Sequence, residues 1–419
     1  MTAPVGRVTD GRAPGAPTAN APPTVDAPPT VDAPSAGGAP DEVRIALAAL
    51  SRVVEPDDDV LRALVRSVGP VEAWDRIRRR DRVLPPRFLA RAAARLDGVD
   101  PQQDLDRAAA VGARLVCPGD AEWPHRMQGL EAVDAEAHAV WVRGAGSLAD
   151  MTERAVAVVG ARAATEYGVH MADRIAGGLA DAGWVVVSGG AVGIDGAAHR
   201  AALASGTPTL AVLACGVDLA YPPGHHRLLG RIAEDGLVLS EYPPGSSPMR
   251  HRFLVRNRLL AGLSHGTVVV EAAIRSGALS TLRWAQRLAL GAMVVPGPVT
   301  SAMSSGCHWA LREGGVVCVT GSSDVLDVVG RFGDDAAPRP SGPESSRDSL
   351  GTEARRVLEA TPVRAFAHPD RIAVAAGLAP LRVASLLNQL CDSGFVEAAD
   401  GGFRVAAAQR RARREAAGA

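Results

Sequence analysis

A short basic segment in the middle of the chain is the clearest sign of chemistry in this sequence. Four arginines and one aromatic residue fall within nine residues in the stretch RHRFLVRNR. Guanidinium groups neutralise backbone phosphates while an aromatic ring stacks on a base, and this combination binds single strands without strict sequence preference. A solvated basic face with the aromatic ring in the core is the alternative interpretation. The contact residues predicted here are Arg250, Phe253, Arg256, Asn257 and Arg258.

Small and polar residues that follow apolar runs form a second group of candidates. Glycine lets the backbone approach a ligand closely, and free N–H groups at the start of a helix attract anions. The same residues could instead serve tight packing of strands on helices, or cap helices, and the sequence leaves these alternatives open. The predicted phosphate-binding residues of this group are Arg162, Ser188, Gly189, Gly190, Ser276 and Gly277.

Evidence for catalysis is weak. His199 follows Asp195 by about one helical turn and could be oriented by it, and Glu271 could act as a base, but no nucleophile with an adjacent base is evident. His199 is interpreted mainly as a packed structural residue. The chain contains neither a GxGxxG nor a GxxxxGK[ST] motif, and no clustered metal-ligand spacing. We therefore expect a protein that is not an enzyme and that has no cofactor and no metal.

The elements that must position these residues are short, continuous apolar strands separated by amphipathic helical stretches. Strands that are apolar throughout indicate a sheet covered on both faces, and their alternation with helices indicates parallel order. This pattern predicts an α/β, extended Rossmann-like, doubly wound and mostly parallel sheet, in which ligands bind beyond the carboxyl ends of the strands. The predicted strands are 155–159, 184–188, 209–213, 237–240, 267–271, 292–295 and 316–320.

Composition limits the class of protein. The net charge of the 419 residues is −1, so any DNA site must be a local patch, and all the basic residues are Arg. The five cysteines form no CxxC pair, which argues against a disulfide framework or a zinc site. No run approaches the 18 apolar residues of a membrane span, and the N-terminus lacks a signal-peptide pattern. We expect a soluble, cytoplasmic protein.

Changes in composition divide the chain into segments. The Ala- and Pro-rich residues 1–40 read as a disordered tail, and residues 332–351 as a linker. Residues 352–405 show a helix-turn-helix followed by a hairpin, which predicts a winged helix, although its second helix carries Arg382 as its one cation. The remaining segments are a small helical domain of SAM or helix-hairpin-helix type (41–110), the Rossmann-like DNA-binding core with a β lead-in (111–331) and an Arg/Ala-rich tail (406–419).

The ordered set of motifs across residues 154–329 resembles the DprA/Smf family of DNA-processing proteins. The motifs include VAVVGARAATEYG, SGGAVGIDGAAHRAAL, AYPPGHHRLL, FLVRNRLLAGLS and VVVEAAIRSGALST. The resemblance implies a homodimer that binds single-stranded DNA, protects it and helps load the RecA recombinase, without known catalysis. It assigns the phosphate-binding arginine to Arg162, and a basic residue three positions before a base-contacting aromatic to Arg250 and Phe253.

Two other readings stay open. A Rossmann-like nucleotide phosphoribohydrolase would share the architecture, but its PGGxGTxxE motif is absent. A winged-helix transcription regulator would use the C-terminal segment on duplex DNA. Departures from the family pattern, His226 in the YPxxN motif and GALST for GSLIT, concern local packing or pocket polarity. The sequence places neither the dimer surface nor a RecA-contacting surface, and it leaves transformation, repair and defence open as physiological roles.

Overall fold

The computed structural model describes residues 38–330 and 350–407. Contacts divide the chain into two compact units, Met1–Ala337 and Pro338–Ala419, with the division inside the predicted linker. The predicted tails lie almost entirely outside the described residues, as does the predicted linker. Each unit is therefore described by itself.

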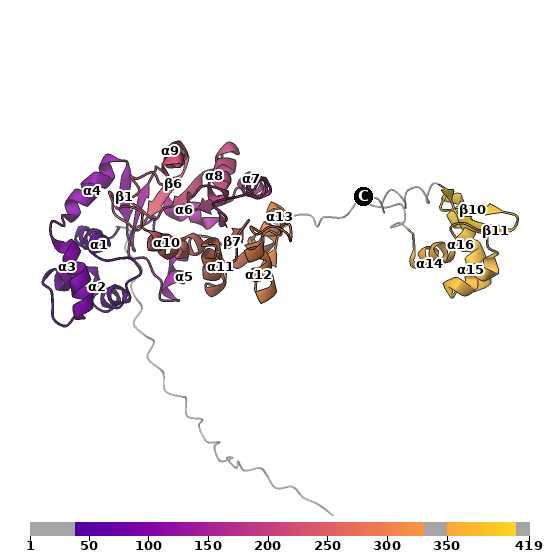
Figure 1. Cartoon of the computed structure of the whole chain (residues 1–419), viewed down its shortest axis with the longest axis horizontal. Coiled ribbons are helices and arrows are strands. Elements are labelled where there is room, and N and C mark those ends of the chain that lie inside the picture. The colour runs from indigo at the N-terminus through magenta and orange to yellow at the C-terminus, as the bar shows by residue number, and fades with distance from the viewer. Residues whose placement is uncertain (1–37, 331–349, 408–419) are drawn as a thin grey trace, which may run out of the picture. The chain divides into compact units, whose positions relative to one another are not determined.

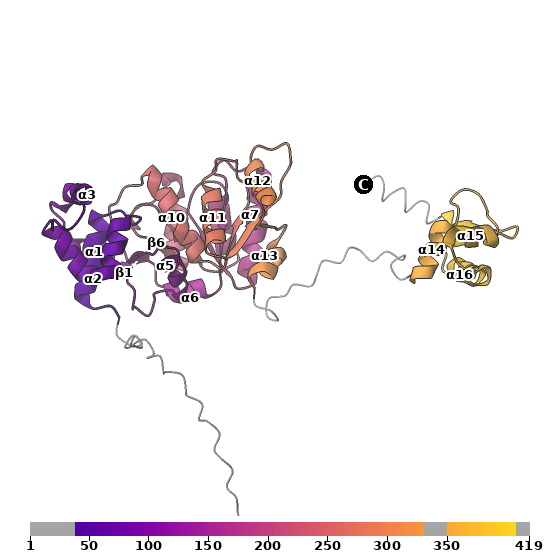
Figure 2. The same ribbon diagram turned by 90° about the horizontal axis from the view of Figure 1, so that it is seen from below.

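The first unit is built on one nine-stranded sheet (Figures 1 and 2). Its strand order is β1-β2-β6-β5-β4-β3-β7-β8-β9, in which β3 to β9 are parallel and β1 and β2 are antiparallel additions at one edge. The predicted doubly wound, mostly parallel sheet is confirmed. The strands are β1 (Ala113–Val116), β2 (Val140–Arg143), β3 (Ala155–Val159), β4 (Val185–Ser188), β5 (Thr209–Val212), β6 (Leu237–Ser240), β7 (Gly266–Val269), β8 (Gly291–Val294) and β9 (Val317–Cys318).

The strand order reverses between β3 and β7, because β4, β5 and β6 are added on one side of β3 and β8 and β9 on the other side of β7. Loops that follow β3 and β7 therefore leave the sheet in opposite directions at its carboxyl edge. This reversal marks the position, here called the crevice, at which open α/β sheets bind ligands. The residues after β3, β4 and β7 are the ones that can reach it.

Helices cover both faces of the sheet, as the apolar strands require. One face carries α7, α8 and α13, whose side chains share a cluster with Val156, Val186 and Val268. The other face carries α10, α11 and α12, packed on Val159, Leu210 and Val294. The bounds are α5 (Gln128–Glu131), α6 (Leu148–Glu153), α7 (Glu166–Asp181), α8 (Ile194–Ala204), α9 (His226–Asp235), α10 (Arg250–Gly262), α11 (Ala278–Arg287), α12 (Ser305–Glu313) and α13 (Ser322–Val329), with 3-10 turns at His125–Met127 and Pro223–His225.

The predicted small helical domain consists of α1 (Asp41–Val53), α2 (Asp59–Arg78), α3 (Pro86–Leu96) and α4 (Pro101–Ala110). Gly69, at φ 78°, interrupts α2 just before Pro70, whose missing backbone N–H cannot continue the hydrogen bonding of a helix. These helices do not have a separate core, because Leu47 and Leu50 belong to one apolar cluster with Trp141 and Leu213 of the sheet region. The helical layer is thus an extension of the Rossmann-like core.

The second unit has its own apolar cluster, which includes Val357, Ile372, Leu387 and Val405. Its element order is that of the predicted winged helix: α14 (Thr352–Ala360), α15 (Pro369–Ala376), α16 (Pro380–Asp392), β10 (Val396–Ala399) and β11 (Gly402–Val405). Gly377, at φ 66°, ends α15, and the hairpin turn runs through Asp400 and Gly401 as the DG pair predicts.

No single helix of the described residues is long and apolar enough to cross a membrane, and α15 with α16 meets that test only as a pair bent by 105°.

Candidate nucleic-acid interface

Helix α10 divides the basic segment between two environments. Arg250, His251 and Leu254 are exposed and Phe253 is half-buried, whereas Arg252 and every residue from Arg256 to Leu260 is buried. Residues 250, 253 and 254 lie three and four positions apart and so share one face of the helix. Among the residues that the structure describes, the Arg250 side chain makes no hydrogen bond or ion pair, so its guanidinium is available to a ligand.

The outer face of α10 meets the loop that follows β3. The guanidinium carbon of Arg162 lies 4.9 Å from the ring centroid of Phe253, and the ring of Tyr221 lies 5.7 Å from the same centroid at an interplanar angle of 51°. Arg162 and Tyr221 are both exposed. Three groups suited to phosphate and base therefore converge from the β3 loop, the β5–α9 connection and α10. Sequence reasoning missed Tyr221, although it lies in the motif AYPPGHHRLL.

Arg256 does not face the crevice. It is buried, and its Nη1 donates to the Gly189 carbonyl oxygen at 3.0 Å and to the carbonyl of Val212. Burial lowers the pKa of Arg256 to about 10, although the nearby Asp195 opposes this shift. In the structure Arg256 thus holds the β4 loop against β5, and its predicted direct contact with DNA stays a prediction.

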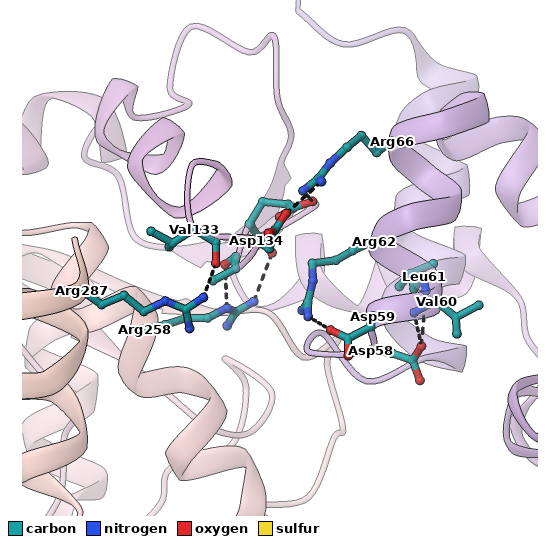
Figure 3. Close-up of polar contacts among 12 residues, drawn as sticks. Asp58, Asp59, Val60, Leu61, Arg62, Arg66, Val133, Asp134, Arg258 and Arg287 are labelled. Carbon is teal, nitrogen blue, oxygen red and sulfur yellow. Dashed lines mark hydrogen bonds and ion pairs between the residues drawn. The ribbon is translucent and has the colours of Figure 1, made fainter.

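Arg258 is also engaged inside the protein. Its guanidinium donates to both carboxyl oxygens of Glu241, at 2.5 and 2.6 Å, with the two side chains 3% and 4% exposed. Its Nε donates to the carbonyl of Ala135. Figure 3 shows Arg258 and Arg287 reaching the segment around Asp134 from the core while Arg66 of α2 reaches it from the other side. Arg258 is thus neutralised by Glu241 inside the protein, and its predicted contact with DNA stays a prediction.

Internal hydrogen bonds hold the loop after β4. The Ser188 hydroxyl is fully buried and donates to the Val158 carbonyl at 2.6 Å. The Gly189 N–H donates to the Asp195 carboxyl at 3.1 Å. Gly190, at φ 69°, accepts a hydrogen bond at its carbonyl from His225 Nδ1 at 3.0 Å. Ser188 and Gly189 therefore shape the crevice without presenting a donor to it.

The candidates after β7 lie at the start of α11. The Ser276 hydroxyl accepts a hydrogen bond from the Ala278 N–H at 3.2 Å, and the Gly277 carbonyl accepts one from Asn257 Nδ2 at 3.1 Å. Asn257 is buried and ties α10 to this loop, whereas Gly277 is exposed. Arg275, next to them, is exposed and adds a cation to the same edge.

The candidate catalytic residues are held apart from one another. His199 is fully buried with its Nδ1 2.8 Å from the Thr209 hydroxyl, and burial lowers its pKa to about 3. Asp195 faces the β4 loop, and Glu271 accepts from the N–H and hydroxyl of Thr165 at 2.9 and 2.7 Å. Within residues 38–330 and 350–407, no group of three His, Cys, Asp or Glu side chains could hold a metal ion.

The fold and this edge define a class: a Rossmann-like core with arginines and aromatic rings at the carboxyl edge of its sheet and a helical layer packed on it, in a chain that also has a separate small C-terminal unit. Comparison with known proteins specifies the family. Residues 114–330 match the family model for DNA recombination-mediator protein A. The putative DNA processing protein DprA of Mycobacterium tuberculosis H37Rv is 46% identical over 373 residues, which are 87% of this chain and 95% of that protein.

One solved structure agrees with this family, and a second is similar over a smaller part of the chain. The DNA processing protein A of Streptococcus pneumoniae is 28% identical and matches 70% of this chain and 99% of its own with a TM-score of 0.57. The DNA processing protein A of Helicobacter pylori, described with its single-stranded DNA binding mode, is 29% identical over 49% of this chain and 91% of its own, with a TM-score of 0.44. The chain belongs to the DNA recombination-mediator protein A family, which confirms the resemblance to DprA/Smf proteins.

Proposed function

We propose that this chain binds single-stranded DNA along the carboxyl edge of its sheet and protects it. The observation that carries the proposal is the contact of Arg162 with Phe253 at 4.9 Å, with Tyr221 on the same ring. An exposed cation beside two aromatic rings can bind a phosphate and stack on a base at neighbouring positions of one strand. Family membership supports DNA as the ligand, because the relatives are DNA-processing proteins.

The proposed contact set is narrower than the sequence-based one. Arg162, Arg250 and Arg275 supply cations, Phe253 and Tyr221 supply rings, and the exposed loop at Ser276 and Gly277 borders them. The other six predicted residues make internal hydrogen bonds that hold this surface in place. They are Ser188, Gly189, Gly190, Arg256, Asn257 and Arg258. With charges grouped at one edge, a molecule of net charge −1 can still attract a polyanion locally.

The finer parts of the proposal follow the family resemblance. We propose that the chain acts in the cytoplasm as a homodimer, that it promotes loading of RecA onto the bound strand, and that it catalyses no reaction.

The two alternative functions would give different results. A phosphoribohydrolase would release free base from nucleoside monophosphates. A transcription regulator would bind duplex DNA in a sequence-dependent way through residues 350–407.

The test is fluorescence anisotropy with a labelled single strand, the matching duplex and an RNA of the same sequence over a range of salt. We expect the single strand to bind most tightly and the affinity to fall steeply as salt rises. Arg162→Ala should weaken binding to all sequences and reduce the magnitude of the log–log salt slope by about 0.7. Phe253→Ala should weaken binding by about 1–3 kcal/mol, roughly 5- to 150-fold, with the slope unchanged.

Arg78→Ala is the matched control, because it removes the same charge from an exposed position on α2 far along the chain from the crevice. It should leave the affinity unchanged. Equal binding of single strand and duplex would contradict the proposed preference for single strands. Wild-type affinity in both Arg162→Ala and Phe253→Ala would show that the site is elsewhere. RecA loading is tested separately by the DNA-dependent ATP hydrolysis of RecA with and without the chain.

A further inference from the structure

The carboxyl groups of Asp195 and Glu271 lie where Rossmann-like folds bind the phosphates of a nucleotide. Such folds hold phosphate at the N-termini of the helices that follow the strands at the crevice. Here the helices are α7, after β3, and α8, after β4. We propose that Asp195 and Glu271 are specificity-determining residues that fill these two phosphate positions from inside, so that the crevice rejects free nucleotides and accepts a DNA backbone laid across its rim.

At α8, several donors that an anion would use already have partners inside the protein. Asp195 Oδ2 accepts from the N–H groups of Gly189 at 3.1 Å and Ala191 at 3.4 Å, and the Gly160 N–H interacts with the same carboxyl. At the start of the helix, the Ile194 N–H donates to the Ala161 carbonyl at 3.2 Å and the Gly196 N–H donates to the Ala191 carbonyl at 3.0 Å.

The α7 position is filled in the same way from a different strand. Glu271 follows β7, is 1% exposed and crosses the reversal point to reach Thr165, the residue before α7. Its two oxygens accept from the Thr165 N–H at 2.9 Å and the Thr165 hydroxyl at 2.7 Å. The Thr165 hydroxyl in turn accepts from the Gly168 N–H at 3.2 Å. A carboxyl of the protein thus spans the crevice between β3 and β7.

Little space remains between the two loops. A Cβ at Gly193, which has φ 83°, would lie 2.3 Å from the carbonyl oxygen of Ala161, and a Cβ at Gly160 would lie 2.7 Å from the Ile194 side chain. Loops in such contact leave no room for a phosphate group beneath the rim. The backbone of Arg162 takes part in this contact, whereas its exposed side chain lies against the Phe253 ring outside it, where the backbone of a polymer can pass.

The part of the inference that concerns DNA rests on the proposed function, whereas the exclusion of nucleotides does not. Two variants separate these parts. Asp195→Ala removes the internal acceptor beside the buried guanidinium of Arg256, whose Nε has no partner among the described residues, and so creates a cationic vacancy lined by N–H donors. Glu271→Ala creates a second vacancy at Thr165 and serves if Asp195→Ala does not fold.

The experiment measures binding of AMP and inorganic pyrophosphate by calorimetry, and thermal stability with phosphate or chloride at matched ionic strength, on the full chain. The wild type should show no saturable binding up to about 1 mM. Asp195→Ala and Glu271→Ala should each bind pyrophosphate at least about tenfold more tightly than the wild type and be stabilised by phosphate over chloride. Asp173→Ala, at an exposed position of α7, is the matched control and should behave as the wild type.

Saturable micromolar binding of AMP by the wild type would overturn the inference. So would two folded variants that gain no anion binding. Single-stranded DNA binding is measured on the same samples. A wild type that rejects AMP but binds no single strand would refute the proposed function while leaving the filled phosphate positions in place.

Discussion

Neighbouring arginines of helix α10 have opposite roles because helical geometry sends them to different surroundings. Arg250 projects into solvent, whereas Arg258, eight positions later, is buried against Glu241. A buried ion pair adds little to the stability of the folded state compared with an apolar pair in its place. Removing one partner is costly, however, because it leaves an uncompensated charge in a medium of low polarity. Arg258 should therefore govern stability and Arg250 affinity.

Arg258→Ala should lower the free energy of unfolding by about 3–5 kcal/mol, because Glu241 stays buried without its cation. Urea unfolding followed by tryptophan fluorescence measures this, since all six tryptophans of the chain lie before residue 310 and report the first unit. Arg231→Ala is the control: its pair with Asp235 is 63% and 46% exposed, and the loss of stability should be small. A stable Arg258→Ala protein that has lost DNA affinity would restore Arg258 as a contact residue.

At the scale of elements, the helical layer is fastened to the start of α10. Glu55, which follows α1, pairs with Arg252 at 2.7 Å and with Arg95 of α3 at 2.8 Å, and His251 Nε2 lies 3.5 Å from its second oxygen. Arg252 also lies 4.3 Å from the ring centroid of Tyr242. The helix that carries Arg250 and Phe253 is thus held by residues from the N-terminal helices.

This contact should depend on pH. Burial alone would raise the pKa of Glu55, but Arg252 and Arg95 outweigh burial and lower it. A carboxyl with a lowered folded pKa stabilises the protein above its unfolded pKa of about 4.3, and this stabilisation is lost as the pH falls through the folded pKa. Glu55→Gln should therefore lower the free energy of unfolding by about 1–3 kcal/mol at pH 7, with a smaller difference from the wild type in acid.

Urea unfolding at pH 7 and at successively lower pH measures this difference. Glu72→Gln, which alters an exposed i,i+4 pair with Arg76 on α2, should change stability by no more than about 0.5 kcal/mol at any of these pH values. A Glu55→Gln deficit that does not shrink as the pH falls would contradict the assigned role of its charge.

At the scale of the whole molecule, two units with separate apolar cores share one chain. The helix of the second unit that a winged helix would place in a DNA groove, α16, carries Arg382 alone as a cation. That guanidinium lies 2.8 Å from a carboxyl oxygen of Glu353. Leu381 of α16 and Val374 of α15 are 89% and 84% exposed. These features favour a contact with protein over a contact with duplex DNA.

A chain that ends at residue 337 should therefore keep its affinity for single strands within about threefold, which is under 1 kcal/mol. Residues 338–419 alone should show no duplex binding at physiological salt. Anisotropy on both fragments measures this, with circular dichroism to verify that each is folded. Loss of most of the affinity on truncation would place part of the DNA site in the second unit.

The order of strands and helices could be predicted from the sequence, because burial on both faces of a parallel sheet demands continuous apolar runs that are visible in the chain. The strands 155–159 and 237–240 were predicted with the bounds that the structure has. The three helices and the hairpin of the second unit were also located, since Gly377 and the DG turn are local signals.

The tertiary structure decided which polar residues are exposed at the carboxyl edge of the sheet and which are buried. The sequence shows a cluster of arginines at Arg250–Arg258, but residue type does not reveal whether a guanidinium meets solvent or a carboxyl such as Glu241, which lies 17 residues away from Arg258. The same holds for the contact of Arg162 with Phe253, and for Asp195 and Glu271, whose partners come from other loops. Contacts between residues far apart in the chain depend on how the sheet brings its loops together. Local sequence patterns therefore do not predict them.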